Sequence, residues 1–115
     1  MTAFIQENYA GKISLEDIAN AGAVGQSKCC KLFARFFFQS PIMYLTQYRL
    51  TKSIELLVNT DMTIIEIAFS VGFGSASYYA ATFRRWVRKS PAEYRKEAGT
   101  QRRRLLNQEV SIIQN

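Results

Sequence analysis

Chemically active side chains are few in this 115-residue sequence, and the groups on which most catalytic and metal sites depend are missing. There is no histidine, which removes the commonest general acid–base and the commonest metal ligand. The two cysteines, Cys29 and Cys30, are adjacent, so they form neither a zinc cluster nor a useful intrachain disulfide. No glycine-rich phosphate loop and no nucleophile paired with a base is present. The sequence therefore predicts a protein that is not an enzyme and has no metal or cofactor.

The charge balance favours a polyanionic partner. The chain carries a formal net charge of +6 and has a pI near 9.6, although a mildly basic charge also serves solubility. With 48% apolar and 21% charged residues, the composition is typical of a globular domain. No apolar run is long enough to span a membrane, the N-terminus lacks a secretion signal, and the cysteine pattern fits a reducing compartment. We therefore expect a cytoplasmic protein with no membrane contact.

Basic, hydroxyl and amide side chains concentrate in residues 26–37, on one side of a predicted helix. Lysine and arginine can donate to guanine O6 and N7, and serine can pair with several base edges. The alternative is a face that is only solvated, but contact with DNA is favoured, most of all for Lys31. The candidates for base contact here are Gln26, Ser27, Cys30 and Lys31, and those for phosphate contact are Lys28 and Arg35.

A second segment, residues 76–87, repeats this arrangement with weaker chemistry. Its outer face offers alanine, which can touch a thymine methyl but discriminates little between bases, beside arginines suited to phosphate. We expect the first segment to carry most base readout and the second to supply mainly affinity. The candidates for base contact are Ser77, Ala80 and Ala81, and those for phosphate contact are Tyr78, Arg84 and Arg85.

The two segments belong to an internal repeat. Residues 15–19 align with residues 64–68 at an offset of 49. After the next turn the offset becomes 50, which pairs Phe33 with Phe83. A change of one residue within a loop is what a duplicated structural unit tolerates. The chain therefore contains two copies of one helical unit.

Helix-start signals and apolar periodicity divide the chain into helices. Proline follows serine at residues 40–41 and 90–91, and capping boxes begin at Ser14, Thr63 and Ser90. No segment sustains the alternation of an exposed strand. The expected fold is all-α, with seven helices near residues 2–10, 15–21, 26–37, 41–58, 64–70, 76–87 and 91–98.

Each copy has the layout of a helix-turn-helix unit. A small residue, Ala19 or Ala68, lies where two helices must approach closely, and glycines bracket each turn. An αα-hairpin used only for packing would look similar, but two copies on a basic chain favour DNA binding. We expect a domain over residues 1–98 and a frayed basic extension over residues 99–115. Within the domain the expected parts are a first subdomain at about 2–40, a linker helix at about 41–58 and a second subdomain at about 59–98.

The buried face of each predicted reading helix follows from the 3.6-residue period. Cys29 lies on such a face and is expected to be a small buried hydrophobe rather than a redox group. The residues expected in the core are Cys29, Leu32, Phe33 and Phe36 in the first helix, and Tyr79, Phe83, Trp86 and Val87 in the second.

Further phosphate candidates lie outside the two segments. Helix N-termini present free N–H groups to an anion, which makes the helix starts at Ser14 and Thr63 candidates. Lys12, Arg49 and Lys52 are basic candidates. Arg49 could instead brace the two units, and both interpretations stay open. The arginines at 102–104 are expected to form a solubilising tail rather than a further backbone contact.

An ordered set of residues spans both copies. In the first it comprises residues 15–19 (LEDIA), 32–33 (LF), 40–41 (SP), 44–45 (YL) and 49–50 (RL), and in the second residues 67–68 (IA), 72–73 (GF), 77–79 (SYY), 83–84 (FR) and 90–95 (SPAEYR). The set covers roughly residues 2–97 and resembles the AraC/XylS family of transcription regulators. The resemblance implies seven helices, with two homeodomain-like helix-turn-helix subdomains joined by a long linker helix. It also implies recognition helices in successive major-groove segments on one face of double-stranded DNA, often with bending.

Several positions depart from the family pattern. Gly25 stands where serine or asparagine usually caps the first recognition helix. Phe38 and Arg88 stand where glycine generally follows each recognition helix, so those helix ends are expected to differ in geometry. Ala81 replaces a common arginine base reader, and Cys29 replaces a usual leucine. These departures weaken the transfer of DNA contacts but not of the fold.

The resemblance implies a bacterial regulator of transcription, more often an activator. Family members are commonly joined to an N-terminal effector-binding or dimerisation domain, so this chain is either a small regulator or a fragment lacking that domain. The alternative function is a helix-turn-helix module that docks a protein partner such as RNA polymerase with little specific DNA readout. Binding that weakens steeply with salt would favour DNA, because phosphate contacts release counterions.

Overall fold

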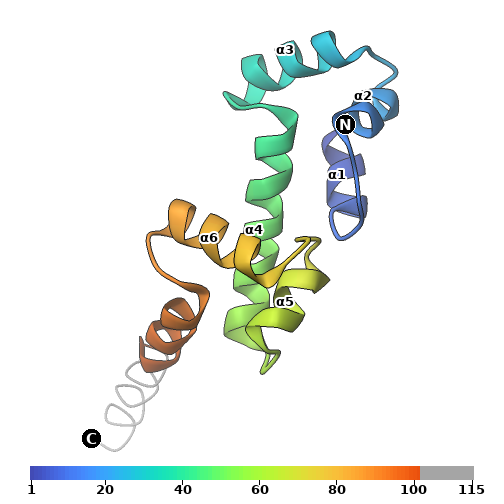
Figure 1. The fold of residues 1–115 in the computed structure, drawn as a ribbon. Helices are drawn as coiled ribbons and strands as arrows, with labels where there is room; N and C mark the ends of the chain where they lie inside the picture. The colour runs from blue at the N-terminus through green and yellow to red at the C-terminus, as the bar shows by residue number, and fades with distance from the viewer. Residues whose placement is uncertain (102–115) are drawn as a thin grey trace, which may run out of the picture.

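The computed structural model describes residues 1–101, and this part of the chain is entirely helical, without a strand (Figure 1). The all-α architecture expected from the sequence is confirmed. The helices are α1 (Thr2–Asn8), α2 (Leu15–Ala21), α3 (Gln26–Phe37), α4 (Pro41–Asn59), α5 (Ile64–Ser70), α6 (Ala76–Val87) and a C-terminal helix at residues 91–101.

The starts of the helices coincide with the predicted capping signals. Ser14 Oγ accepts from the Asp17 N–H, while the Asp17 carboxylate accepts from the Ser14 N–H. Thr63 and Glu66 form the same pair of bonds at α5. At the C-terminal helix, Ser90 Oγ accepts from the backbone N–H three residues later. These bonds satisfy N–H groups that the first turn of a helix leaves free.

The two ends of the domain differ from the prediction. Helix α1 ends at Asn8, two residues early, and the chain turns so that the Gly11 N–H donates to the Asn8 carbonyl oxygen. The C-terminal helix continues past Ala98 to Gln101, so the predicted extension begins inside a helix. The rest of that extension, residues 102–115, lies outside the described residues. No helix within residues 1–101 is long and apolar enough to cross a membrane.

Two hydrophobic cores lie along α4. The first is built around α1, α2 and α3, and α4 contributes Leu45 to it. The second is built around α5 and α6, and α4 contributes Leu50 and Leu57. Helix α4 therefore belongs to both units and holds them on one rigid rod. The buried residues are Ile5, Ile18, Ala19, Cys29, Phe33 and Leu45 in the first core, and Leu50, Leu57, Ile67, Ala68, Val71, Phe73, Tyr79 and Phe83 in the second.

The turn of the second unit has the conformation that its sequence predicts. Gly72 has a φ of +98°, which favours glycine, and the Phe73 side chain is buried beside Tyr79. Ala19 and Ala68 are both buried, where α2 and α5 approach their neighbours. Small residues there allow the close helix contacts that each unit needs.

Two residues expected in the core are exposed. Phe36 is 64% exposed and Trp86 is 39% exposed, so their predicted burial is wrong. They occupy equivalent places in the repeat, in the last turns of α3 and α6. Periodicity predicts the direction in which a side chain points, but not how far along the helix a neighbouring helix covers it. Cys29, Phe33, Tyr79 and Phe83 are buried as expected, and Leu32 and Val87 are half-buried.

Candidate nucleic-acid interface

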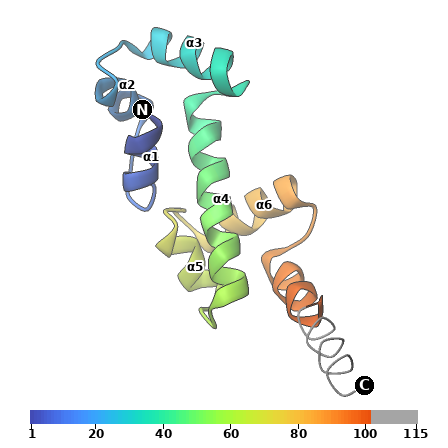
Figure 2. The same cartoon turned by 180° about the vertical axis from the view of Figure 1, so that it is seen from behind.

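Helices α3 and α6 cross α4 at separate levels and run toward the same side of the molecule in both views (Figures 1 and 2). Each is the second helix of its unit and rests on its own core. The 19 residues of α4 give a rod of roughly 28 Å at 1.5 Å per residue. This length is comparable to one DNA turn of roughly 34 Å. Two helices that are held along one rod and run toward one side suit neighbouring stretches of one groove.

The outer face of α3 is exposed along its length. Gln26, Ser27 and Lys31 are exposed, whereas Cys30 is half-buried. Gly25 occupies the N-cap and provides no side-chain bond, so the first N–H groups of α3 have no capping side chain. Free N–H groups and a positive helix end favour an anion such as phosphate.

The outer face of α6 is exposed but carries fewer hydrogen-bonding groups. Ser77 and Ala81 are exposed and Ala80 is half-buried. Tyr78 is 58% exposed, and its backbone N–H donates to Ser75 Oγ, which caps the helix. The exposed face of α6 thus has the small side chains that the sequence predicts, and its weak base readout stays a prediction.

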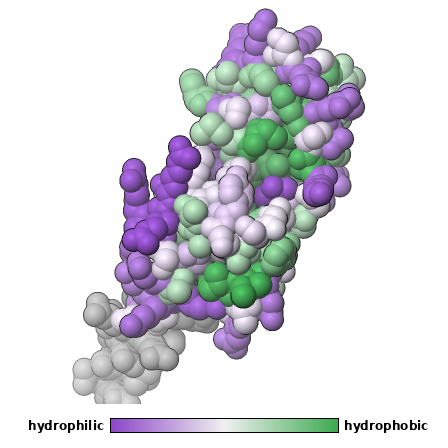
Figure 3. Space-filling view, viewed as in Figure 1, coloured by the Kyte–Doolittle hydropathy of each residue, from purple (hydrophilic) through white to green (hydrophobic). Residues whose placement is uncertain are grey.

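The basic phosphate candidates on the two helices are all at the surface. Lys28, Arg35, Arg84 and Arg85 are exposed, and the Arg35 guanidinium lies 5.7 Å from the centre of the Phe36 ring. In Figure 3, hydrophilic side chains gather over the outer end of α6 and the start of the next helix. Outside the helices, Lys12 is exposed in the loop before α2.

Two other candidates are engaged in local bonds. The exposed Thr63 hydroxyl accepts the Glu66 N–H and so serves as the cap of α5. Lys52 Nζ lies 3.5 Å from Glu55 Oε2 and 5.5 Å from the centre of the Tyr48 ring. The Glu55 carboxylate, followed by Tyr48, raises the pKa of Lys52. Contact with phosphate would have to compete with these partners.

The position of Arg49 favours the bracing interpretation. Its Nε donates to the Tyr9 carbonyl oxygen at 2.8 Å, and its Nη2 donates to the Gly11 carbonyl oxygen at 2.8 Å. Burial lowers the pKa of the Arg49 guanidinium, and the nearby Tyr78 phenol opposes that shift. The side chain therefore links α4 to the loop after α1 instead of extending freely into solvent.

Cys29 behaves as a core residue. Its side chain is fully buried, and burial raises the pKa of its thiol. Because the thiolate is the reactive form of cysteine, a buried thiol with a raised pKa is a poor nucleophile. The expectation that Cys29 fills space is therefore supported by its surroundings.

Sequence reasoning missed a groove between α4 and α6. It has a volume of about 580 Å³. The exposed side chains of Met43 and Trp86 form part of its apolar wall, and Arg85 and Arg88 contribute positive charge. The sequence gives no reason to single out Met43, and its periodicity places Trp86 in the core. The exposure of both residues depends on the crossing of two helices, which no local pattern records.

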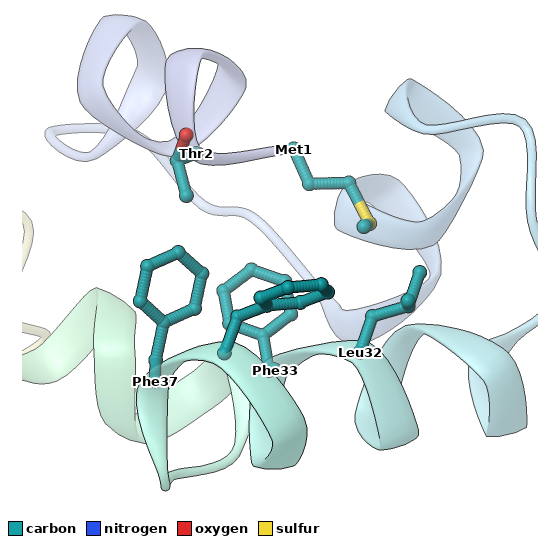
Figure 4. A pocket seen from close by; sticks show the side chains of 6 residues that line it. Met1, Thr2, Leu32, Phe33 and Phe37 are labelled. Atoms are coloured by element: carbon teal, nitrogen blue, oxygen red, sulfur yellow. The ribbon is translucent and has the colours of Figure 1, made fainter.

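A smaller apolar hollow lies between the start of α1 and α3. Its volume is about 230 Å³, and Phe36 forms part of its lining. Figure 4 shows Met1 and Thr2 facing the α3 side chains Leu32, Phe33 and Phe37 across it. The hollow explains why Phe36 is exposed although its direction on the helix is that of a core residue.

Comparisons with known proteins place this geometry in a family. Residues 18–97 match the family model described as "Helix-turn-helix domain". The chain is 38% identical over 96 residues to the HTH-type transcriptional regulator YdeC of Bacillus subtilis, covering 84% of this chain and 33% of that protein. It is 34% identical over 96 residues to the melibiose operon regulatory protein of Escherichia coli, covering 84% of this chain and 32% of that protein. The chain thus spans about a third of the length of these curated relatives.

Solved structures share the fold. The DNA-binding domain of the transcriptional factor AdpA, in complex with a target DNA, is 25% identical with a TM-score of 0.84, and the match covers 88% of this chain and 91% of that one. An AraC-type regulator from Chromobacterium violaceum is 26% identical with a TM-score of 0.80, covering 84% of this chain and 87% of that one. The relatives are regulators of transcription rather than enzymes. The chain belongs to the AraC/XylS family of helix-turn-helix transcription regulators.

Proposed function

We propose that this protein binds double-stranded DNA sequence-specifically through α3 and α6, each reading one half of a bipartite site. The observation that carries the proposal is the repetition of one exposed reading helix, held on separate cores by a shared rod. Support also comes from the related AdpA domain, which is described in complex with a target DNA.

The two halves of the site are proposed to contribute unequally. Helix α3 exposes Ser27 and Lys31, which can form hydrogen bonds with base edges. Helix α6 exposes Ala81 at its centre and arginines that suit phosphate. Helix α3 then supplies most of the sequence preference, and α6 supplies mainly affinity.

The regulatory role is proposed to be transcription activation in the bacterial cytoplasm. One relative, 30% identical over 92 residues, is the virulence regulon transcriptional activator VirF of Yersinia enterocolitica. Because the curated relatives are about three times as long as the matched segment, the domain is proposed to work with an effector-binding or dimerisation domain.

Selection from random duplex DNA, followed by affinity measurements at 50 and 200 mM salt, tests the proposal. The expected result is a motif with two halves and an affinity that falls steeply with salt, with a log–log slope of about −0.9 for each phosphate contacted. Enrichment of no motif, together with weak binding at both salt concentrations, would overturn it. A scrambled duplex of equal length is the control for nonspecific attraction.

The groove between α4 and α6 favours a second candidate function, the docking of a protein such as RNA polymerase. It combines an exposed indole and an exposed methionine with two arginines, a mixture found at protein interfaces. Met43→Ser should weaken activation of a reporter gene without changing DNA affinity if the groove docks a partner. Ser77→Ala, on the outer face of α6, is the comparison variant, because it should lower the affinity for DNA itself.

A further inference from the structure

We propose that Tyr9, Arg49 and Gly72 form a joint that fixes the two helix-turn-helix units relative to each other and thereby sets the half-site spacing that the protein accepts. These three residues are called the inter-unit joint. They come from the loop after α1, the middle of α4 and the turn between α5 and α6. The inference rests on the proposed function, because it concerns how both units bind one duplex.

Tyr9 is the hydrophobic element of the joint. Its side chain packs against both cores, and it is the one partly buried residue that the two cores share within residues 1–101. Its ring meets the Tyr48 ring edge-on, with centroids 5.2 Å apart and planes at 71°. A rotation of one unit against the other would therefore expose apolar surface at Tyr9, which resists the motion.

Arg49 is the polar element of the joint. Its guanidinium donates at 2.8 Å to each of the Tyr9 and Gly11 carbonyl oxygens. Both carbonyls follow the end of α1, and their engagement accompanies the early end of that helix. A planar guanidinium donates in two fixed directions at once, which a lysine ammonium on a flexible stem does not reproduce. The loop of the first unit is thereby held to a defined position along α4.

Gly72 brings the second unit into backbone contact with this position. A Cβ at residue 72 would lie 2.4 Å from the Tyr9 carbonyl oxygen and 2.8 Å from Arg49 Nε. The backbone at Gly72 also has a φ of +98°, in the region that glycine favours. The turn between α5 and α6 thus packs directly against the hydrogen bond from Arg49 to the Tyr9 carbonyl oxygen. There is no room for a side chain at residue 72.

A rigid joint has a measurable consequence for DNA binding. When one unit binds its half-site, the second unit is presented to the duplex at one distance and one rotation, so its effective concentration is high for one spacing only. When the joint is loosened, the second unit samples many distances and rotations relative to the first. The peak affinity should then fall, and the affinity should depend less on spacing.

The test uses duplexes selected by the wild-type protein from random DNA. Three probes are compared by fluorescence anisotropy: both half-sites at the selected spacing, the same with two base pairs inserted, and a single half-site. Arg49→Lys keeps the charge but loses the two-directional donation. We expect unchanged affinity for the single half-site, about tenfold weaker binding at the selected spacing, and a smaller penalty for the insertion.

Arg95→Lys is the matched control. Arg95 also donates to two carbonyl oxygens, those of Leu57 at 3.0 Å and Thr60 at 3.3 Å, but both lie at the end of α4 that packs on the second core. This variant loses an equivalent pair of bonds without touching the joint. It should keep the spacing profile of the wild type. An equal loss of spacing preference in Arg95→Lys would overturn the proposal, because a general weakening of the fold would explain both variants.

The remaining outcomes separate the joint from a phosphate contact. If Arg49→Lys keeps the wild-type spacing profile, the joint does not set the spacing. The same conclusion follows if Arg49→Ala lowers the affinity for all three probes equally. If the slope of log affinity against log salt concentration also falls by about the value of one phosphate contact, the side chain contacts DNA.

Gly72→Ala is the second variant, and we expect a changed or flattened spacing profile from it. A wild-type protein that binds single and paired half-sites equally would instead refute the proposed function.

Discussion

Phe38 and Arg88 lie fifty residues apart at equivalent positions of the repeat, and both have left-handed backbone conformations, with φ of 58° and 71°. Phe38 follows α3 and Arg88 follows α6, and each N–H donates to the carbonyl oxygen four residues earlier. These are positions at which glycine is expected, and the sequence suggested that the helix ends would differ in geometry. Instead both ends keep the glycine-like geometry with a side chain attached. The repeated fold therefore determines the backbone more strongly than the local residue does.

Replacing Phe38 by glycine should stabilise the protein. A left-handed conformation costs a residue with a side chain about 1 kcal/mol, and Phe38 is 90% exposed, so little packing is lost. We expect the free energy of unfolding in urea to rise by about 1 kcal/mol and Tm by roughly 4–8 °C. Phe38→Ala is the control, since it removes the ring but keeps Cβ. Equal stability of the two variants would contradict the strain argument.

Helices α3 and α6 should respond differently to changes at their N-caps. Ser75 Oγ accepts the Tyr78 N–H, whereas Gly25, at the equivalent position, provides no side-chain bond. Ser75→Ala should therefore lower the free energy of unfolding by about 1 kcal/mol, and Gly25→Ser should raise it by a few tenths. Urea denaturation measures both changes. A gain from Ser75→Ala would show that the hydroxyl is not acting as a cap.

Helix boundaries were predictable because their signals are local. Serine and threonine caps, with acidic residues three positions later, are read from four consecutive residues, and the bonds they imply at Ser14 and Thr63 are present. The end of α1 was not predictable in this way. The carbonyls of Tyr9 and Gly11 accept from Arg49, about forty residues away in the sequence. A boundary that depends on such a partner leaves no trace in the nearby residues.

The candidate interface was predictable in part. Periodicity placed Lys31 and Arg84 on exposed faces, where the structure also has them. It failed at Phe36 and Trp86, because the direction of a side chain around a helix does not reveal where the neighbouring helices end. The groove beside Trp86 and the role of Arg49 depend on how α4 meets other segments. Such features become visible only when the tertiary arrangement is known.

Lys31→Ala and Arg84→Ala should affect DNA binding in different ways. Loss of a base contact at Lys31 should relax the selected motif in one half and cost about 1–3 kcal/mol of discrimination. Loss of a phosphate contact at Arg84 should weaken binding to all sequences and reduce the salt slope by about one. Selection from random DNA and salt titration measure the two effects. Ala81→Arg is the complementary variant, and it should create a preference in the second half.

The division of labour between α3 and α6 has a clear counter-result. If neither Lys31→Ala nor Ala81→Arg changes the selected motif, base readout does not depend on these faces. Glu66→Gln, in α5, is the control, because it lies outside both reading helices and should leave the motif unchanged.

Tyr79→Phe should change stability mainly at alkaline pH. The Tyr79 hydroxyl is buried and has no hydrogen-bond partner within the described residues, although the Ser53 hydroxyl, which donates to the Leu50 carbonyl oxygen, lies nearby. Burial raises the pKa of Tyr79 above its ordinary value of about 10. A folded-state pKa above the unfolded one means that the folded state retains its proton longer. The stability linked to this group is therefore complete below about pH 10 and is lost as the pH rises through the folded-state pKa.

The variant with phenylalanine has no proton to lose at this position. Its free energy of unfolding should match or slightly exceed that of the wild type at pH 7, because an unpaired buried hydroxyl is removed. Above pH 10 it should fall less steeply than the wild type. Urea unfolding between pH 7 and pH 11 measures this difference, and Tyr78→Phe, which alters an exposed ring, should run parallel to the wild type. Parallel curves for Tyr79→Phe would show that its ionisation is not linked to folding.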